Sequence, residues 1–453
     1  MVAAIVPWST RFPAGPWWVR CSLLTPSMVL TLSPWWLLAL AVPILLIGEA
    51  VVRRFQVLSR FNVPVPVVGG LLCATVVLLL ALTGVATISW QTKVTAGWWT
   101  WLVTPDHAWV ARPAKNLNLP LLVGFFTCVG LLAPVQLLRT GGRALVILLG
   151  GATLLAVVQN LVGVAFAGAL QAPPLLGVVC GALTLVGGHG TALGFVPRLE
   201  EAGFPAAAAA GAAAATFGLI AGGLLAGPVG EWLLRRFGTA DASGGPRTAA
   251  GVRPSSGFIH EVRGVAGFGL QAAGHGLLIA GCVKAGAWVS FGLERAGVSF
   301  PAYLGALLVG VAVRAAHDSA GGTWLKPEVV SRIAAVLLPM FLTVTLAAIN
   351  LAELKAVAGP MVVILGVNTV VSLAFAALVI WPLLGRDHEA GVMVAGLIGF
   401  GVGSTATAVA AMDAIVRRRG PAPRAFALVP PTGGFLIDLT NAPVISASIS
   451  LLR

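Results

Sequence analysis

Long apolar stretches separated by short polar loops dominate the chain from about residue 34 onward. A membrane-spanning helix needs ~20 mostly apolar residues, and ten stretches reach or approach that length. They are 34–52, 66–88, 117–138, 144–169, 206–234, 265–292, 301–316, 329–351, 357–384 and 424–450, of which 301–316 is the shortest. The pattern predicts an all-α polytopic membrane protein.

Two further apolar segments, 173–195 and 388–412, differ from these spans because they are rich in Gly and carry hydroxyl groups or a His. Gly in a helix interior costs ~1 kcal/mol relative to Ala. Irregular backbone at membrane depth persists only where protein or water covers it. We therefore expect both segments to be re-entrant hairpins.

The two halves of the chain are expected to be repeats. One ungapped shift of 215 residues places Gly181 on Gly396 and Gly188 on Gly403, so that the Gly-rich segments coincide. Five expected spans precede the second half, so its copy enters the membrane from the opposite side. Inverted repeats with broken helices are typical of secondary transporters. We expect repeats at 34–234 and 264–453 and a linker at 235–263.

Composition and charge support a membrane class. Only 9% of the residues are charged and 58% are hydrophobic, whereas soluble proteins carry about 25% charged residues. The net charge of +13 does not indicate a nucleic-acid partner, because the basic residues are spread through short loops. About twice as many Lys and Arg residues fall on the side of the 235–263 linker, which is therefore expected to be cytoplasmic. The surface is expected to contact membrane lipid.

Residues 1–33 do not fit the repeat pattern. Pro7, Pro13, Pro16 and Pro26 interrupt any helix there, and Met28 stands just before the first good span. We expect this stretch to be an N-terminal extension that is not folded, or the result of a start residue assigned too early.

The tips of the two expected hairpins carry the candidate substrate site. The first reads GGHGTALGF from Gly187 and the second reads GFGVGSTATAVAAMD from Gly399. A broken helix exposes N–H groups that attract anions and carbonyl groups that attract cations. The alternative is that Gly, Ser and Thr serve only close helix packing. The expected substrate-binding residues are Gly187, Gly188, His189, Gly190, Thr191, Gly401, Gly403, Ser404, Thr405 and Thr407, with Asn160 and Asn441 from neighbouring spans.

Asp438 is the candidate cation ligand. A carboxylate within a membrane span costs ~3 kcal/mol on insertion scales and is functional by default. Thr440, Asn441 and Thr405 are expected to complete a tentative Na⁺ site with it. The alternative is a helix-end carboxylate that reaches interfacial water. His189 has two open roles, bracing the hairpin tip or contacting substrate.

Several stretches carry a family resemblance, namely FFTCVGLLAPVQLLRTGGR (125–143), VVQNLVG (157–163), LTLVGGHGTALGF (183–195), TFGLIAGGLLAGPV (216–229) and AFALVPPTGGFLIDLTNAPVI (425–445). With them the chain resembles the glutamate:sodium symporter family over roughly 34–450. The resemblance implies two inverted five-helix repeats, elevator-type movement, a homodimer and Na⁺-driven glutamate uptake in the bacterial inner membrane. It implies no cofactor, with Na⁺ as the coupling ion.

The second motif departs from the family pattern. Leu397 and Ile398 stand where the family pattern has a His-Cys pair, Ser404 stands in place of an Ala, and Ala406 stands in place of a Pro. These changes leave a cation-coupled carrier of di- or tricarboxylates as an alternative to a glutamate carrier. A remote alternative is an intramembrane hydrolase that uses Ser404 and His189, but no acid that would orient the His is evident.

Overall fold

The structure is a computed structural model of the 453-residue chain, and it describes residues 29–56, 58, 63–105, 115–133, 141–237, 257–295 and 302–452. Residues 1–28 of the expected N-terminal extension and residues 238–256 of the expected linker lie outside the described residues. The ends of the linker are helical, because α12 extends to Phe237 and α13 begins at Phe258.

Eight helical stretches within the described ranges are long and apolar enough to cross a membrane. The chain is therefore a multi-pass α-helical membrane protein, as the hydrophobic pattern predicts. The eight are α1 (Pro34–Arg54), α3 (Val65–Leu82), α8 (Gly142–Ala169), α12 (Ala207–Phe237), α14 (Leu270–Arg295), α16 (Pro327–Ala347), α17 (Ala358–Phe375) continued by η5 (Ala376–Ile380) and α18 (Trp381–Leu383), and α21 (Pro423–Pro431) continued by η6 (Thr432–Leu436) and α22 (Ile437–Leu451).

Two of the ten expected spans are helices outside this set. The first, α6 (Leu119–Leu131), has 13 residues, and the rest of the stretch expected at 117–138 is mostly outside the described residues. The second, α15 (Ala302–Ser319), ends in a polar turn with Arg314, His317 and Asp318. The two helices pack backbone to backbone, since a Cβ on Gly130 of α6 would overlap the carbonyl oxygen of Leu307.

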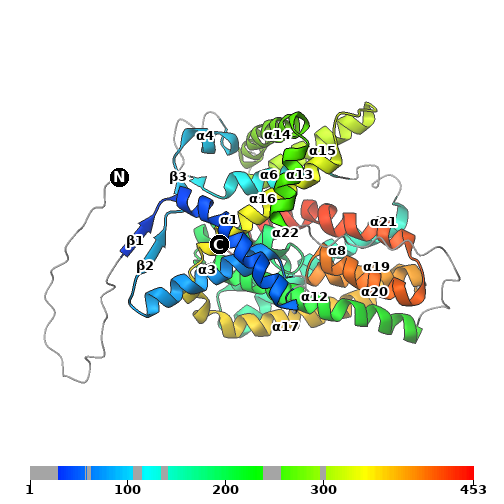
Figure 1. The fold of residues 1–453 in the computed structure, drawn as a ribbon. Coiled ribbons are helices and arrows are strands. Elements are labelled where there is room, and N and C mark those ends of the chain that lie inside the picture. Colours follow the sequence, from blue (N-terminus) through cyan, green and yellow to red (C-terminus); the bar gives the residue numbers. More distant parts are fainter. Residues whose placement is uncertain are drawn as a thin grey trace, which may run out of the picture.

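The expectation of an all-α chain needs one addition, because short strands cover one side of the molecule beside α1 and α3 (Figure 1). Strand β1 (Val29–Leu32) pairs in parallel with β2 (Thr87–Trp90), and β3 (Lys93–Val94) pairs antiparallel with β4 (Lys115–Asn116). Strand β1 lies within the expected unfolded extension, so residues 29–32 of that stretch have a defined partner.

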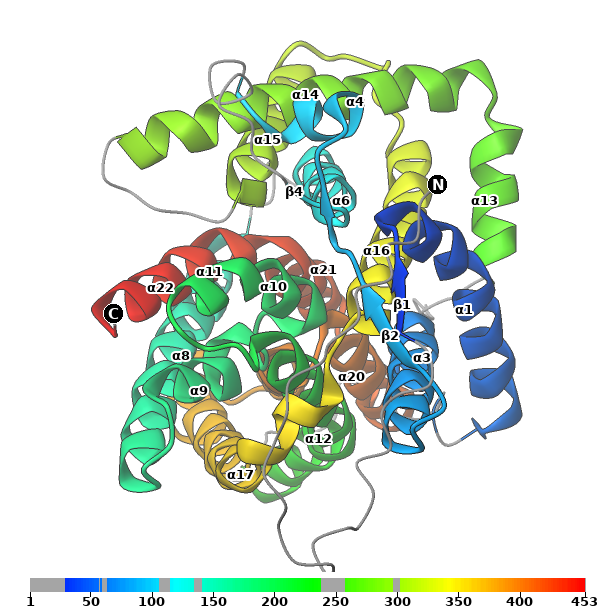
Figure 2. The same cartoon turned by 90° about the vertical axis from the view of Figure 1, so that its left-hand side faces the viewer.

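The helices form two groups that lie side by side (Figure 2). We name the first the hairpin group; it holds α8, α12, α17, α21 and α22 together with α9 (Pro174–Val178), η3 (Val179–Leu183), α10 (Gly188–Gly194), α11 (Val196–Glu201), α19 (His388–Val402) and α20 (Thr405–Arg419). We name the second the frame group; it holds α1, α3, α6, α14, α15 and α16 together with α4 (Gly97–Thr100), η2 (Trp101–Val103) and α13 (Phe258–Gly267). Each group draws helices from both halves of the sequence.

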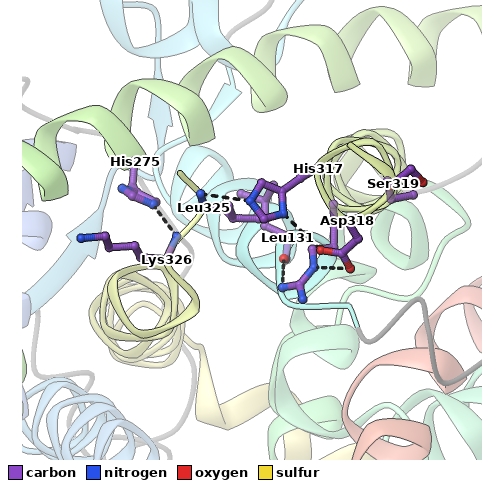
Figure 3. A network of polar contacts seen from close by, with 9 residues as sticks. Leu131, His275, His317, Asp318, Ser319, Leu325 and Lys326 are labelled. Atoms are coloured by element: carbon purple, nitrogen blue, oxygen red, sulfur yellow. Dashed lines mark hydrogen bonds and ion pairs between the residues drawn. The ribbon is translucent and has the colours of Figure 1, made fainter. Parts of the chain in front are cut away.

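A polar junction fixes the start of α16 in the frame group (Figure 3). The His275 ring donates from Nδ1 to the Gln271 carbonyl at 2.7 Å and accepts at Nε2 from the Lys326 N–H at 3.0 Å. The His317 ring donates to Asp318 at 3.1 Å and accepts from the Leu325 N–H at 3.4 Å. Two successive backbone N–H groups that precede the helix therefore have side-chain partners.

Candidate functional site

The first expected hairpin is broken where the sequence predicts it. Gly181 lies within the bounds of η3, but its φ of −104° and ψ of −137° are not helical dihedral angles. The next helix, α10, begins only at Gly188. Helix α8 supports the break, because the Asn160 Oδ1 accepts the Ala182 N–H at 2.9 Å. A Cβ on Gly181 would lie 2.7 Å from that oxygen, so Gly is required for this close approach.

The tip of this hairpin is formed by Gly187 and Gly188. Gly188 has φ +65°, which is a left-handed conformation that side chains with a Cβ rarely adopt. The following His189 is buried, and its Nε2 lies 3.0 Å from the Thr216 hydroxyl of α12. Since Thr216 gives its own hydrogen to the Ala212 carbonyl, the imidazole is the donor. This contact supports the bracing role for His189.

The second hairpin is broken between α19 and α20. Gly403 ends α19, and Ser404 is the N-cap of α20 in a reciprocal capping box with Thr407. The buried Thr407 hydroxyl donates to the Gly399 carbonyl at 2.7 Å and accepts the Ser404 N–H at 2.9 Å. Ser404 and Thr407 therefore hold the break in place.

The two tips face each other. A Cβ placed on Gly188 would lie 3.8 Å from the Gly403 carbonyl oxygen. Helix α12 passes against the second tip, because a Cβ on Gly222 would lie 3.2 Å from the Gly403 backbone. At the first tip, Gly190 lies next to Leu338 of α16, at 3.8 Å from the site of an added Cβ. The facing tips thus also border the frame group.

Asp438 lies beside the first tip. Its Oδ1 accepts a hydrogen bond from the Thr191 hydroxyl at 3.4 Å. Asp438 as a whole is only partly buried. Tyr303 of α15 lies next to both side chains, although its hydroxyl meets hydrogen-bond geometry with none of the described residues. Its ring stacks on Phe126 with centroids 4.0 Å apart. Sequence reasoning missed this Tyr, which is the only one in the chain.

The other expected Na⁺ ligands have different neighbours. Asn441 is buried and donates to the Ala182 carbonyl at 3.2 Å, so it contacts the break of the first hairpin. Thr440 faces α8, where its hydroxyl accepts from Thr153 at 2.8 Å. Thr405 lies against Gly434, with 3.5 Å between its hydroxyl oxygen and an added Cβ. The described contacts therefore link Asp438 to Thr191 rather than to these three residues.

Sequence analysis identified only some of the buried amide side chains that lie behind the tips. Asn160 donates to Ser448 of α22 at 3.0 Å in addition to its contact with Ala182, so its amide joins α22 to the first break. Gln159 donates to the Gly401 carbonyl at 2.8 Å, which joins α8 to the second hairpin. Asn368 of α17 donates to the Cys180 carbonyl at 2.9 Å. A polar residue inside an apolar stretch was the available signal for Asn368.

A cavity of about 510 Å³ lies between the two helix groups and reaches Leu193 and Gly194 of α10. Its charged lining residues are Lys93, Glu200 and Glu353. Partial burial raises the pKa of Glu200, the nearby Glu353 carboxylate raises it further, and Lys93 opposes both. The cavity therefore extends to the helix that carries the first tip, and it has charged groups on its lining.

Comparison with known proteins decides the family. The family model described as "Sodium/glutamate symporter" matches residues 30–100 and 94–421. The chain belongs to the sodium/glutamate symporter family. The sodium/glutamate symporter of Escherichia coli (strain K12) is 34% identical over 410 residues, which cover 90% of this chain and 95% of that relative. The symporter of Haemophilus influenzae (strain ATCC 51907 / DSM 11121 / KW20 / Rd) is 30% identical over 435 residues, covering 94% and 99%.

Membership of the sodium/glutamate symporter family confirms the resemblance read from the motifs and makes the chain a transporter, not an enzyme. The hydrolase interpretation is wrong, and its two residues have other partners: His189 binds Thr216, and Ser404 caps α20. Among solved structures, a sodium proton antiporter from Methanocaldococcus jannaschii aligns at 15% identity with a TM-score of 0.39, covering 92% of this chain and 96% of that one.

Proposed function

We propose that this protein carries glutamate together with Na⁺ across the membrane. Two relatives at 34% and 30% identity, each covered almost completely, are sodium/glutamate symporters. The observation that carries the proposal is the pair of broken helices whose tips, Gly188 and Gly403, face each other. Broken helices near the middle of the membrane are where secondary transporters bind substrate and coupling ions.

Glutamate would bind between the tips. The N-terminus of α20 carries Ser404 and Thr405, and N–H groups at a helix start attract a carboxylate. This arrangement supplies positive potential without a buried Arg. Ser404 stands in this motif where the resemblance expects Ala, so a di- or tricarboxylate is the substrate class against which glutamate must be tested.

Na⁺ would bind at Asp438. An ionised carboxylate holds a cation, and the bound cation offsets the cost of burying the charge. Thr191 contributes a hydroxyl within 3.4 Å of this carboxylate, so Na⁺ binding and the geometry of the first tip are coupled. Asn441, Thr440 and Thr405 remain candidates for further oxygen ligands.

Movement of the hairpin group against the frame group would provide alternating access, as in an elevator. The support is that both hairpins belong to one group and that each group mixes helices from the two sequence halves (Figure 2). The same mixing is expected of two inverted repeats with re-entrant hairpins. Helix α19 has 15 residues and extends about 22 Å, which is shorter than a bilayer core of about 30 Å. A homodimer in the bacterial inner membrane completes the proposal.

The test is uptake into liposomes that contain the purified protein. Labelled glutamate is supplied under an inward Na⁺ gradient at equal pH, and separately under a pH gradient without Na⁺. We expect accumulation only with the Na⁺ gradient, and competition by glutamate but not by citrate or succinate. Uptake that follows the pH gradient alone would exclude Na⁺ coupling, whereas competition by citrate or succinate alone would exclude glutamate.

A further inference from the structure

Three amide side chains gather behind the hairpin breaks, and we name them the amide cluster: Gln159 of α8, Asn368 of α17 and Asn441 of α22. All three have 0% of their surface exposed. Each donates its NH₂ group to a backbone carbonyl of a hairpin, at 2.8 Å, 2.9 Å and 3.2 Å respectively. Because a carbonyl can only accept, these contacts fix which end of each amide is nitrogen and which is oxygen.

The oxygen ends of the amide cluster have no hydrogen-bond donor among the residues that the structure describes. A buried acceptor without a partner costs about 1–3 kcal/mol, and buried polar atoms in native proteins are nearly always paired. Gln159 also donates to the Ser372 hydroxyl at 2.8 Å, and that hydroxyl donates to the backbone carbonyl of Asn368 at 2.7 Å. Ser372 therefore joins Gln159 of α8 to the backbone of α17. The three amide oxygens are therefore acceptors without a described donor. Gln159 directs both of its N–H groups to described partners, whereas Asn368 and Asn441 each direct one.

One cation can satisfy all three amide oxygens at once, whereas one water molecule cannot. One water molecule donates only two hydrogen bonds, so it would leave one of the three oxygens without a donor. A hard cation needs several neutral or charged oxygens and no donor. Backbone that leaves the helical path, as Gly181 does, adds carbonyl groups of the kind that coordinate Na⁺ in broken helices.

We infer that the amide cluster is a Na⁺-binding site, with Gln159, Asn368 and Asn441 as its side-chain ligands. This inference rests on the proposed Na⁺ coupling and adds a site whose side-chain ligands are neutral amides. It assigns Asn441 to this site rather than to the site at Asp438. The cation sits where amides from α8, α17 and α22 meet both hairpins, since Cys180 and Ala182 belong to the first hairpin and Gly401 to the second. Bound Na⁺ would therefore contact the side chains that hold both breaks.

The test measures Na⁺ binding without glutamate or transport. Equilibrium binding of radioactive Na⁺ to the purified protein, with choline chloride as the replacement salt, gives the number of ions per protomer. We expect Asn368→Ala to bind one Na⁺ fewer than the wild type and to lose most of the Na⁺-dependent rise in melting temperature. Thr369→Val is the matched control, because that neighbouring hydroxyl is already bonded to Leu365 at 2.8 Å, and it should bind the wild-type number.

A second variant covers the case in which Asn368→Ala does not fold. Asn368→Asp keeps the side-chain size and places a carboxylate in the site, so half-maximal stabilisation should need at least about tenfold less Na⁺, about 1.4 kcal/mol. Wild-type Na⁺ binding by Asn368→Ala, or equal destabilisation of Asn368→Asp in Na⁺ and choline, overturns the inference. If Asp438→Asn binds one Na⁺ fewer than the wild type and Asn368→Ala binds the wild-type number, the inference is overturned and the proposal for Asp438 stands. Uptake that ignores Na⁺ rejects the proposed function without deciding this binding test.

Discussion

Single residues at the breaks have roles that their chemistry makes specific. Gly181 and Gly188 are needed for different reasons: a Cβ on the first would lie against Asn160, whereas the second has a left-handed φ of +65° and faces the Gly403 carbonyl oxygen. Asp438 is the carboxylate that lies beside these tips and contacts Thr191. Substitutions at the glycines therefore test shape, and substitutions at Asp438 test charge.

Asp438→Asn should weaken Na⁺ dependence sharply. The amide keeps one oxygen that can accept from Thr191, but it loses the negative charge that attracts a cation. We expect the Na⁺ concentration for half-maximal glutamate uptake to rise about tenfold or more, which corresponds to 1.4 kcal/mol. Uptake measured against Na⁺ concentration at fixed pH checks this. Unchanged Na⁺ dependence would mean that Asp438 is not a ligand of the coupling ion.

At the scale of elements, sequence reasoning placed both broken helices, because runs of Gly in an apolar stretch conflict with a continuous membrane helix. It did not find how the breaks are held. The contacts of Gln159 with Gly401 and of Asn368 with Cys180 join positions more than 180 residues apart, and a local pattern does not encode such pairs. The short strands were missed because four-residue and two-residue strands are too brief for a period of two to be visible.

Thr407→Val should destabilise the second break. The variant keeps the shape of the side chain but removes a hydroxyl that bonds both the Gly399 carbonyl and the Ser404 N–H, two groups that also bond each other at 2.9 Å. We expect a loss of about 0.5–1.5 kcal/mol of stability, seen as a lower melting temperature, together with weaker glutamate binding. Thr75→Val is the control, because that hydroxyl only returns to its own helix at Leu71. Equal effects of the two substitutions would contradict a role for Thr407 at the break.

At the scale of the molecule, the hydrophobic pattern predicted the membrane class and most helix positions, but not the division into hairpin and frame groups. That division depends on which helices pack together, and α8 of the first half packs against α17 and α22 of the second. The cavity between the groups also combines distant segments, since Lys93, Glu200 and Glu353 all line it. These charged side chains offer a test of whether the hairpin and frame groups lie as close together as the cavity lining indicates.

Glu200→Gln should stabilise the protein in a pH-dependent way. The pKa of Glu200 is raised in the folded state by burial and by Glu353, so the wild type loses stability as pH rises through that pKa. The neutral amide removes this loss, and we expect a small rise in melting temperature near neutral pH that vanishes at about pH 3–4, below the carboxyl's usual value. Lys93→Gln should have the opposite sign near neutral pH. A gain for Glu200→Gln that persists in acid would contradict this electrostatic origin.

The most direct test of the account is Na⁺-dependent glutamate binding at the facing tips. Titration calorimetry on the purified protein should show glutamate binding in NaCl and none in choline chloride. Gly188→Val should lose this binding while the protein stays folded, because a side chain would project toward the Gly403 carbonyl, 3.8 Å from its Cβ. Gly142→Val carries the same kind of strain at φ +58° with nothing within 4 Å, and it should bind normally. Equal binding in choline, or normal binding by Gly188→Val, would contradict a Na⁺-dependent glutamate site between the two tips.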